Sequence, residues 1–130
     1  MPDEYHKKIL LIEDEPLLAN LLKQRLEANS FEVMLARDGE EGLKILRDTK
    51  PDLILLDIIL PKISGFELME TLRSNTSFQQ APIVIISNLG QDNDIEKGQS
   101  LGAVGYFIKA KISIEDLVNQ LKGFFDGQKI

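Results

Sequence analysis

Residues 50–65 read KPDLILLDIILPKISG, and this stretch decides the fold class of the chain. Its four consecutive apolar residues, 53–56, lead directly into Asp57, and the turn residues Pro61 and Gly65 follow. An unbroken apolar run that ends at turn residues is typical of a parallel strand buried on both faces of a sheet. Asp57 is therefore expected at the carboxyl end of a central strand, the edge at which open α/β sheets bind ligands.

The composition is that of one globular domain. The chain has 130 residues, so we expect a single domain over residues 1–130, with its core at about residues 8–126. The net charge of −6 argues against direct nucleic-acid binding, which relies on a basic surface. The sequence contains no Cys, which excludes disulfides and thiolate metal sites.

The sequence predicts a cytoplasmic protein that does not bind membranes. No apolar run approaches the roughly 20 residues that span a bilayer. The first eight residues, MPDEYHKK, are polar and lack the apolar segment of a signal peptide.

Short apolar runs alternate with helical patterns along the chain. We expect strands at residues 9–12, 31–36, 53–56, 83–86 and 104–108. We expect helices at residues 16–29, from about 38, from about 64, at 92–100 and at 113–125. Asp38 with Glu41 and Ser64 with Glu67 form capping patterns at two of these starts. The segment 92–100 predicts only a weak helix, because Gly98 lies inside it and apolar residues are few.

The alternation predicts an α/β fold in which five helices cover both faces of a five-stranded parallel sheet. Right-handed crossovers leave few possible strand orders. Three of the runs are wholly apolar and two are mixed, which matches three central strands and two edge strands. The doubly wound order 2-1-3-4-5 meets this requirement.

In that order, the ends of four strands bring a polar set to one edge of the sheet: Glu13, Asp14, Asp57, Ser87 and Lys109. Three carboxylates at one edge cannot all ionise cheaply without a cation. Mg²⁺ fits best, because carboxylates, waters and phosphate oxygens are its usual ligands. The lone His6 precedes the first strand, so we expect no zinc site.

The same set predicts phosphoryl transfer to a carboxylate. Asp57 can attack phosphorus and form an acyl phosphate. The reaction requires positioning and charge neutralisation, which the metal and Lys109 would supply. The Ser87 hydroxyl would then hydrogen-bond to the attached phosphoryl group.

These residues resemble those of response-regulator receiver domains, such as the chemotaxis response regulator, over nearly the whole chain. The matches comprise an acidic metal-binding pair, a phospho-acceptor, a hydroxyl and a lysine, here Glu13 with Asp14, Asp57, Ser87 and Lys109. Residues 60–65, LPKISG, resemble the turn after the acceptor, and GAVGY at 102–106 precedes the lysine as in the family.

The resemblance implies a flavodoxin-like fold and a two-component signalling function. The phosphoryl donor would be a phosphohistidine on a sensor histidine kinase or phosphotransfer protein, and the output would go to a downstream protein target. Ser87 and Tyr106 would switch the surface formed by the fourth helix, the fifth strand and the fifth helix. The backbone carbonyl of Ile59 would be a further Mg²⁺ ligand. Such a domain is no enzyme, although it assists its own phosphorylation and dephosphorylation.

Two positions depart from the family pattern. The family usually has a cis proline after the lysine, whereas Ala110 follows Lys109 here. A cis bond before Ala costs about 3 kcal/mol, so we expect a trans peptide. Ile59 is apolar and cannot orient an attacking water.

Other interpretations remain open at this stage. A degenerate receiver would only dock proteins. A phosphatase of the haloacid-dehalogenase type needs a second Asp where Ile59 stands, and in a flavin-binding electron carrier residues 13–15 would repel the phosphate. Ser87 could bond only local backbone, and Tyr106 could be an ordinary edge-strand aromatic. We interpret Glu15 as an acidic helix start only.

Overall fold

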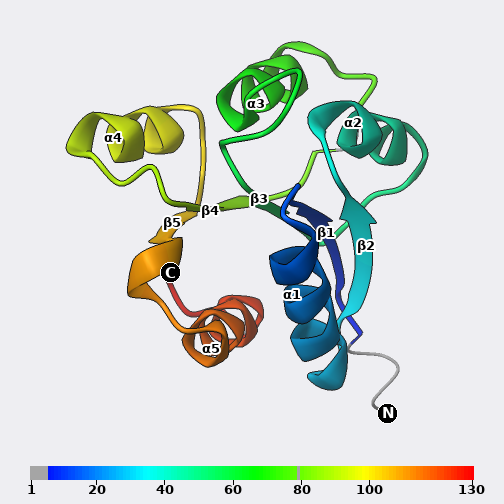
Figure 1. The fold of residues 1–130 in the computed structure, drawn as a ribbon. Coiled ribbons are helices and arrows are strands. Elements are labelled where there is room, and N and C mark those ends of the chain that lie inside the picture. Colours follow the sequence, from blue (N-terminus) through cyan, green and yellow to red (C-terminus); the bar gives the residue numbers. More distant parts are fainter. Residues whose placement is uncertain (1–5, 79) are drawn as a thin grey trace.

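The computed structural model describes residues 6–78 and 80–130 and contains a five-stranded parallel sheet in the order β2-β1-β3-β4-β5 (Figure 1). The strands are β1 (Lys8–Ile12), β2 (Glu32–Ala36), β3 (Leu53–Leu56), β4 (Ile83–Ser87) and β5 (Gly105–Ile108). The predicted topology is confirmed. Residues 1–5 of the polar N-terminal stretch and residue 79 of the loop before β4 lie outside the described residues.

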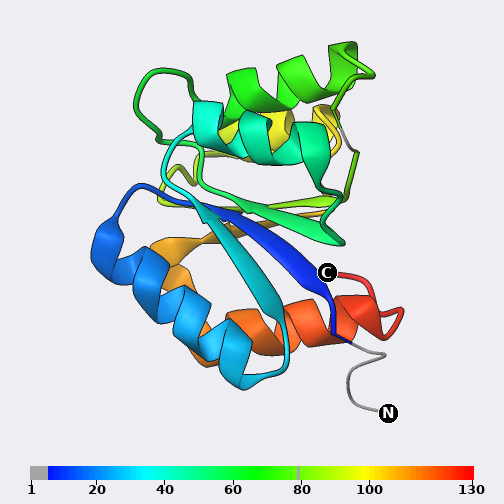
Figure 2. The ribbon, with the colours of Figure 1, turned by 90° about the vertical axis from the view of Figure 1, so that its right-hand side faces the viewer.

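Helices cover both faces of the sheet, as predicted. The helices are α1 (Pro16–Ala28), α2 (Gly39–Asp48), α3 (Gly65–Ser74), α4 (Asp92–Ser100) and α5 (Ile114–Phe125). Helices α1 and α5 lie on one face, and α2, α3 and α4 lie on the other (Figures 1 and 2). None of these helices has the length and apolar character that a bilayer crossing requires.

Strand β3 shows why its sequence is an unbroken apolar run. Leu53 and Leu55 pack in the core under α1 and α5, whereas Ile54 and Leu56 pack in the core under α2 and α3. All four side chains are fully buried. A strand covered on both faces needs an apolar residue at every position, and the charged residue can come only where the strand ends.

The helix starts follow the predicted capping patterns. Asp38 accepts a hydrogen bond from the Glu41 amide at 2.9 Å. Ser64 and Glu67 accept from each other's amides, at 3.1 Å for Ser64 Oγ and 3.3 Å for Glu67 Oε1. These caps fix the ends of the loops that surround the carboxyl edge of the sheet.

Helix α4 is regular over the residues that predicted only a weak helix. Asp94 supports its start by accepting a hydrogen bond from the Gln91 amide at 3.2 Å. Gly98 is buried, and a Cβ atom there would lie 2.7 Å from Ile85 and 3.0 Å from Tyr106. The glycine that lowers the helix propensity is therefore what allows α4 to pack closely on β4 and β5.

The end of the sheet differs from the prediction in two details. Strand β5 begins at Gly105, so Val104 lies outside it, although its amide still bonds to the Ile83 carbonyl at 2.8 Å. Residues Lys109–Lys111 form a short 3-10 helix, η2, which we did not predict. The described residues contain no cis peptide bond, which confirms the trans prediction for Lys109–Ala110.

Gly65 allows the closest approach between α3 and the loop that follows β3. A Cβ atom there would lie 2.5 Å from the Asp57 carbonyl oxygen and 2.7 Å from Ile58 Cα. Backbone atoms cannot move aside as side chains can, so we expect Gly65→Ala to lower the free energy of unfolding by about 2 kcal/mol. Urea denaturation measures this change. The matched control is Gly123→Ala in α5, where the added atom meets only the Gln128 side chain; an equal loss there would contradict the explanation.

Candidate functional site

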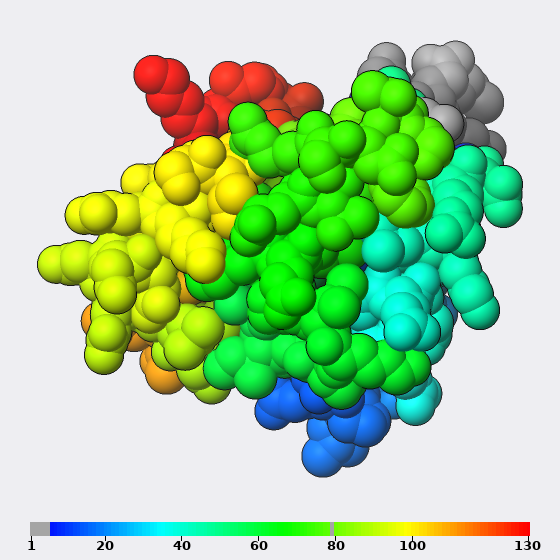
Figure 3. Space-filling view, turned by 90° about the horizontal axis from the view of Figure 1, so that it is seen from above, coloured from blue at the N-terminus to red at the C-terminus, as the bar shows by residue number. Residues whose placement is uncertain are grey.

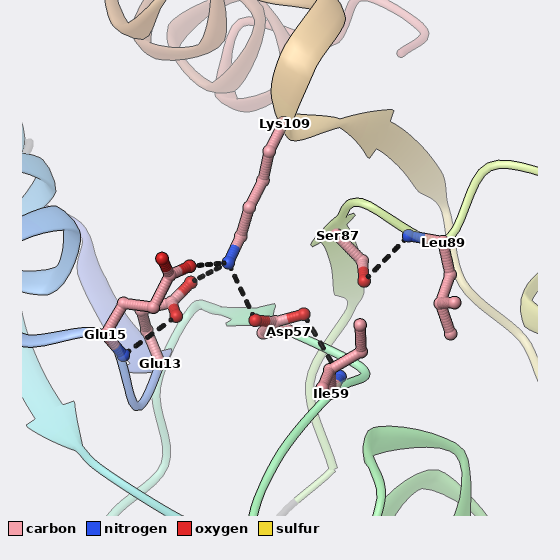
Figure 4. Close-up of polar contacts among 7 residues, drawn as sticks. All are labelled: Glu13, Glu15, Asp57, Ile59, Ser87, Leu89 and Lys109. Atoms are coloured by element: carbon pink, nitrogen blue, oxygen red, sulfur yellow. Dashed lines mark hydrogen bonds and ion pairs between the residues drawn. The ribbon is translucent and has the colours of Figure 1, made fainter.

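Asp57 follows β3 directly and is held by the backbone on both sides. Its amide donates to the Ile12 carbonyl of β1 at 3.0 Å, and its Oδ1 accepts from the Ile59 amide at 3.1 Å. The residue is only 3% exposed. The sheet order therefore places this carboxylate at the centre of the carboxyl edge, with its second oxygen directed toward Lys109, which follows β5 (Figure 4).

Lys109 is the cation of this site. Its Nζ lies 2.7 Å from Asp57 Oδ2, 2.7 Å from Glu15 Oε2 and 2.9 Å from Glu13 Oε1 (Figure 4). Burial alone would lower the pKa of Lys109, but these contacts outweigh it and raise the pKa above its ordinary value. The ammonium therefore stays charged and joins the ends of β1, β3 and β5.

Glu13 is a fully buried carboxylate with an incomplete set of partners. Its Oε2 accepts from the Glu15 amide at 3.1 Å. Its Oε1 contacts Lys109 without hydrogen-bond geometry, so no described residue donates a hydrogen bond to that oxygen. Burial raises the pKa of Glu13 to about 7, and the charge of Asp57 adds to the rise while Lys109 opposes it. The buried oxygen is suited to a further cation.

Three carboxylates at this edge meet the requirements of a hard metal ion. One oxygen each from Glu13, Asp14 and Asp57 lies within 4.8 Å of the others. Asp14 is exposed, so a metal ion held by this cluster would have room for water ligands. The cluster is compatible with Mg²⁺. The role of the Ile59 carbonyl as a further ligand stays a prediction; its side chain is 55% exposed beside Asp57.

Ser87 and Tyr106 contact the same loop residue from two strands. Ser87 ends β4, is fully buried and accepts a hydrogen bond from the Leu89 amide at 3.3 Å (Figure 4). Tyr106 in β5 donates its hydroxyl proton to the Leu89 carbonyl. Burial raises the pKa of Tyr106 to about 12, and the charges of Asp94 and Asp57 add to the rise. The hydroxyl is therefore neutral at pH 7 and acts as a donor.

Comparison with known proteins identifies the domain. Residues 9–122 match the family described as response regulator receiver domain. The chain belongs to this family. A receiver domain receives its signal from a histidine kinase, and it is typically a phospho-acceptor rather than an enzyme.

Curated relatives of two lengths resemble this receiver domain. The polar-differentiation response regulator DivK of Brucella anthropi is 30% identical over 118 residues, which cover 91% of this chain and 95% of DivK. The alkaline phosphatase synthesis transcriptional regulatory protein PhoP of Bacillus subtilis is 39% identical over 104 residues, which cover 80% of this chain and 42% of PhoP. The chain thus spans less than half the length of PhoP.

Solved receiver structures share the fold. The receiver domain of the Francisella response regulator 1452 has a TM-score of 0.85 at 26% identity, covering 95% of this chain and all of that one. The phosphorylated cyanobacterial phytochrome response regulator RcpA has a TM-score of 0.77 at 32% identity, covering 92% of this chain and 91% of RcpA. The predicted recognition and the flavodoxin-like fold are confirmed.

The receiver site contains one residue that sequence reasoning missed. We interpreted Glu15 as a helix start only, and this was wrong, because its carboxylate pairs with Lys109. Glu15 is the N-cap residue of α1, yet its side chain accepts no hydrogen bond from that helix. The sequence offered one signal for this contact: Glu15 is the third consecutive acidic residue after β1, and Lys109 was already expected at the same edge of the sheet.

We expect Asp14→Asn to weaken Mg²⁺ binding by at least about tenfold, because the neutral amide removes one of three charges that attract the ion. Titration calorimetry of the purified protein measures this dissociation constant. Asp48→Asn at the end of α2 is the matched control, since it removes one exposed charge elsewhere. Equal affinities of the two variants would exclude Asp14 from the metal site.

Proposed function

We propose that this receiver domain accepts a phosphoryl group on Asp57 from the phosphohistidine of a sensor kinase or phosphotransfer protein, in a reaction that requires Mg²⁺. One observation carries the proposal. Asp57 is buried at the centre of the carboxyl edge, within 2.7 Å of the Lys109 ammonium and in the same cluster as Glu13 and Asp14. This arrangement supplies a nucleophile together with the charges that phosphoryl transfer requires.

The transfer step balances without a proton from the chain. A lone pair of an Asp57 carboxylate oxygen forms the O–P bond as the P–N bond of the donor breaks. The bonding pair stays on the imidazole nitrogen. The other ring nitrogen of the donor already carries a proton, so a neutral imidazole leaves and the product is an acyl phosphate on Asp57. Bound Mg²⁺ would neutralise charge on the phosphoryl oxygens. Lys109 already lies 2.7 Å from Asp57 Oδ2 and would pair with the same oxygens.

The Ser87 hydroxyl would link the chemistry to the output surface. It accepts from the Leu89 amide, so its own proton is available to a phosphoryl oxygen on Asp57. Rotation of Ser87 toward that oxygen would pull on Leu89, whose carbonyl holds the Tyr106 hydroxyl. We infer that the α4–β5–α5 surface then changes its packing and that a downstream protein target reads this change.

A degenerate receiver that only docks proteins is the second candidate. The pairing of Lys109 with Asp57 beside a cation-compatible cluster favours chemistry over docking alone. A haloacid-dehalogenase mechanism needs a general acid two residues after the nucleophile. The residue there is the apolar, half-exposed Ile59, which argues against this mechanism. A flavin phosphate would meet the carboxylates of residues 13–15 at the end of β1.

We expect Asp57→Asn to abolish phosphorylation, because an amide is a poor nucleophile toward phosphorus. The purified protein is incubated with Mg²⁺ and a small phosphodonor, and its intact mass is then measured. Asp52→Asn is the matched control, since Asp52 precedes the same strand at its opposite end. Wild type and control should gain one phosphoryl group. A gain by Asp57→Asn equal to that of wild type would refute the assignment.

We expect the response to phosphorylation to concentrate at residues 88–112. Only Gly98 of α4 is buried, whereas β1, β3 and β4 are almost wholly buried. Elements with few buried contacts open more readily. Amide hydrogen exchange, with and without a phosphoryl mimic, should show faster exchange in α4 than in these strands and a change confined largely to residues 88–112. Uniform protection that the mimic leaves unaltered would place the output on another face.

A further inference from the structure

Glu15 is the exposed member of the three carboxylates that contact Lys109. Its side chain is 60% exposed, against 0% for Glu13 and 4% for Asp57. A phosphodonor arrives from solvent, so Glu15 is the first of these three charges that it meets. In Figure 4 its carboxylate lies beside that of Glu13, on the Lys109 side of Asp57.

The backbone of Glu15 is fixed, but its side chain is not used by the helix it begins. Its amide donates to Glu13 Oε2 at 3.1 Å, and its carbonyl accepts from the Ala19 amide at 2.9 Å. An N-cap side chain usually accepts a hydrogen bond from the first turn. Here the carboxylate pairs with Lys109 instead, and its charge stays at the mouth of the site.

The charge on Glu15 lies close to the reacting oxygen. Lys109 Nζ is 2.7 Å from both Glu15 Oε2 and Asp57 Oδ2. The two carboxylate oxygens are therefore no more than twice that distance apart. Charges at such a separation interact appreciably even in water, so Glu15 acts on any donor that is in contact with Asp57.

We propose that Glu15 is a specificity-determining residue that favours phosphodonors with a protonated nitrogen leaving group over acyl phosphates. The inference rests on the proposed role of Asp57. With an N-phosphoryl donor, the P–N bond breaks, the pair stays on the protonated nitrogen, and a neutral amine leaves. With acetyl phosphate, the P–O bond breaks and acetate leaves with the pair and a negative charge. The Glu15 carboxylate attracts the cationic nitrogen of the first donor as that donor binds, and it repels the acetate that leaves from the second.

The ratio of two rates isolates this effect from the contact with Lys109. Glu15 also competes with phosphoryl oxygens for the Lys109 ammonium, but that competition affects both kinds of donor alike. The quantity to measure is therefore the rate constant with phosphoramidate divided by the rate constant with acetyl phosphate. Saturating Mg²⁺ removes any change in metal affinity from the comparison.

The experiment compares wild type, Glu15→Gln and Glu27→Gln. Glu27 lies on the same helix and pairs with Lys23 at 3.4 Å, so its substitution removes the same charge and one lysine contact far from the site. We expect the ratio to fall about fivefold in Glu15→Gln and to equal the wild-type ratio in Glu27→Gln. Glu15→Asp, which keeps the charge, should retain most of the wild-type ratio.

Ionic strength gives a second check, made by adding salt to the wild-type protein. Added salt screens the Glu15 charge, so the wild-type ratio should fall toward that of Glu15→Gln. An unchanged ratio in Glu15→Gln, or an equal change in both rate constants, would overturn the inference while leaving the role of Asp57 intact. A wild-type protein that gains no phosphoryl group from either donor would overturn both.

Discussion

The site depends on the pairing of one ammonium with several carboxylates at the carboxyl edge of the sheet. Lys109 contacts Asp57, Glu13 and Glu15, and two of these three side chains are almost completely buried. Buried carboxylates are costly unless they are paired. Because one ammonium cannot neutralise them all, burial raises the pKa of Glu13 to about 7. A divalent cation at this edge would displace the proton of Glu13 and supply the positive charge that the carboxylates lack, so the cluster is compatible with metal binding.

The remainder of the sheet makes this concentration of charge possible. The two cores on its faces are apolar, and the side chains of β1 and β3 that enter them are fully buried. In β1 and β3, charged side chains are therefore confined to the ends of the strands or to the residues just beyond them. The parallel register pairs Ile12 with Leu56, so the residues that follow them, Glu13 and Asp57, are neighbours by construction. Two rigid strands thus hold two repelling carboxylates together.

Contacts among residues that directly follow strands could be predicted from the sequence, because a parallel sheet brings the carboxyl ends of its strands to one edge. Asp57, Glu13 and Lys109 meet for this reason. The pairing of Glu15 could not be predicted in the same way, because Glu15 is the N-cap residue of α1 and the local sequence equally suits a helix start. Helix α4 was underestimated because propensity counts the cost of Gly98 but not the close packing on Ile85 that the missing side chain allows.

Under the proposed function, the loop after β4 would carry the effect of a charge on Asp57 to residues that do not contact Asp57. Ser87 holds the amide of Leu89 and Tyr106 holds its carbonyl, so one residue is fixed by hydroxyls from two adjacent strands. The two contacts differ in kind: the Ser87 oxygen accepts and keeps a free proton, whereas the Tyr106 hydroxyl has used its proton. A phosphoryl group on Asp57 would therefore accept a hydrogen bond from Ser87 without breaking the bond between Ser87 and Leu89. The loop would then move with Ser87. The Tyr106 ring, which lies against Gly98 of α4, would change position because its acceptor had moved. Under the proposed function, one new hydrogen bond from Ser87 to the phosphoryl group would be enough to change the contact between Tyr106 and α4.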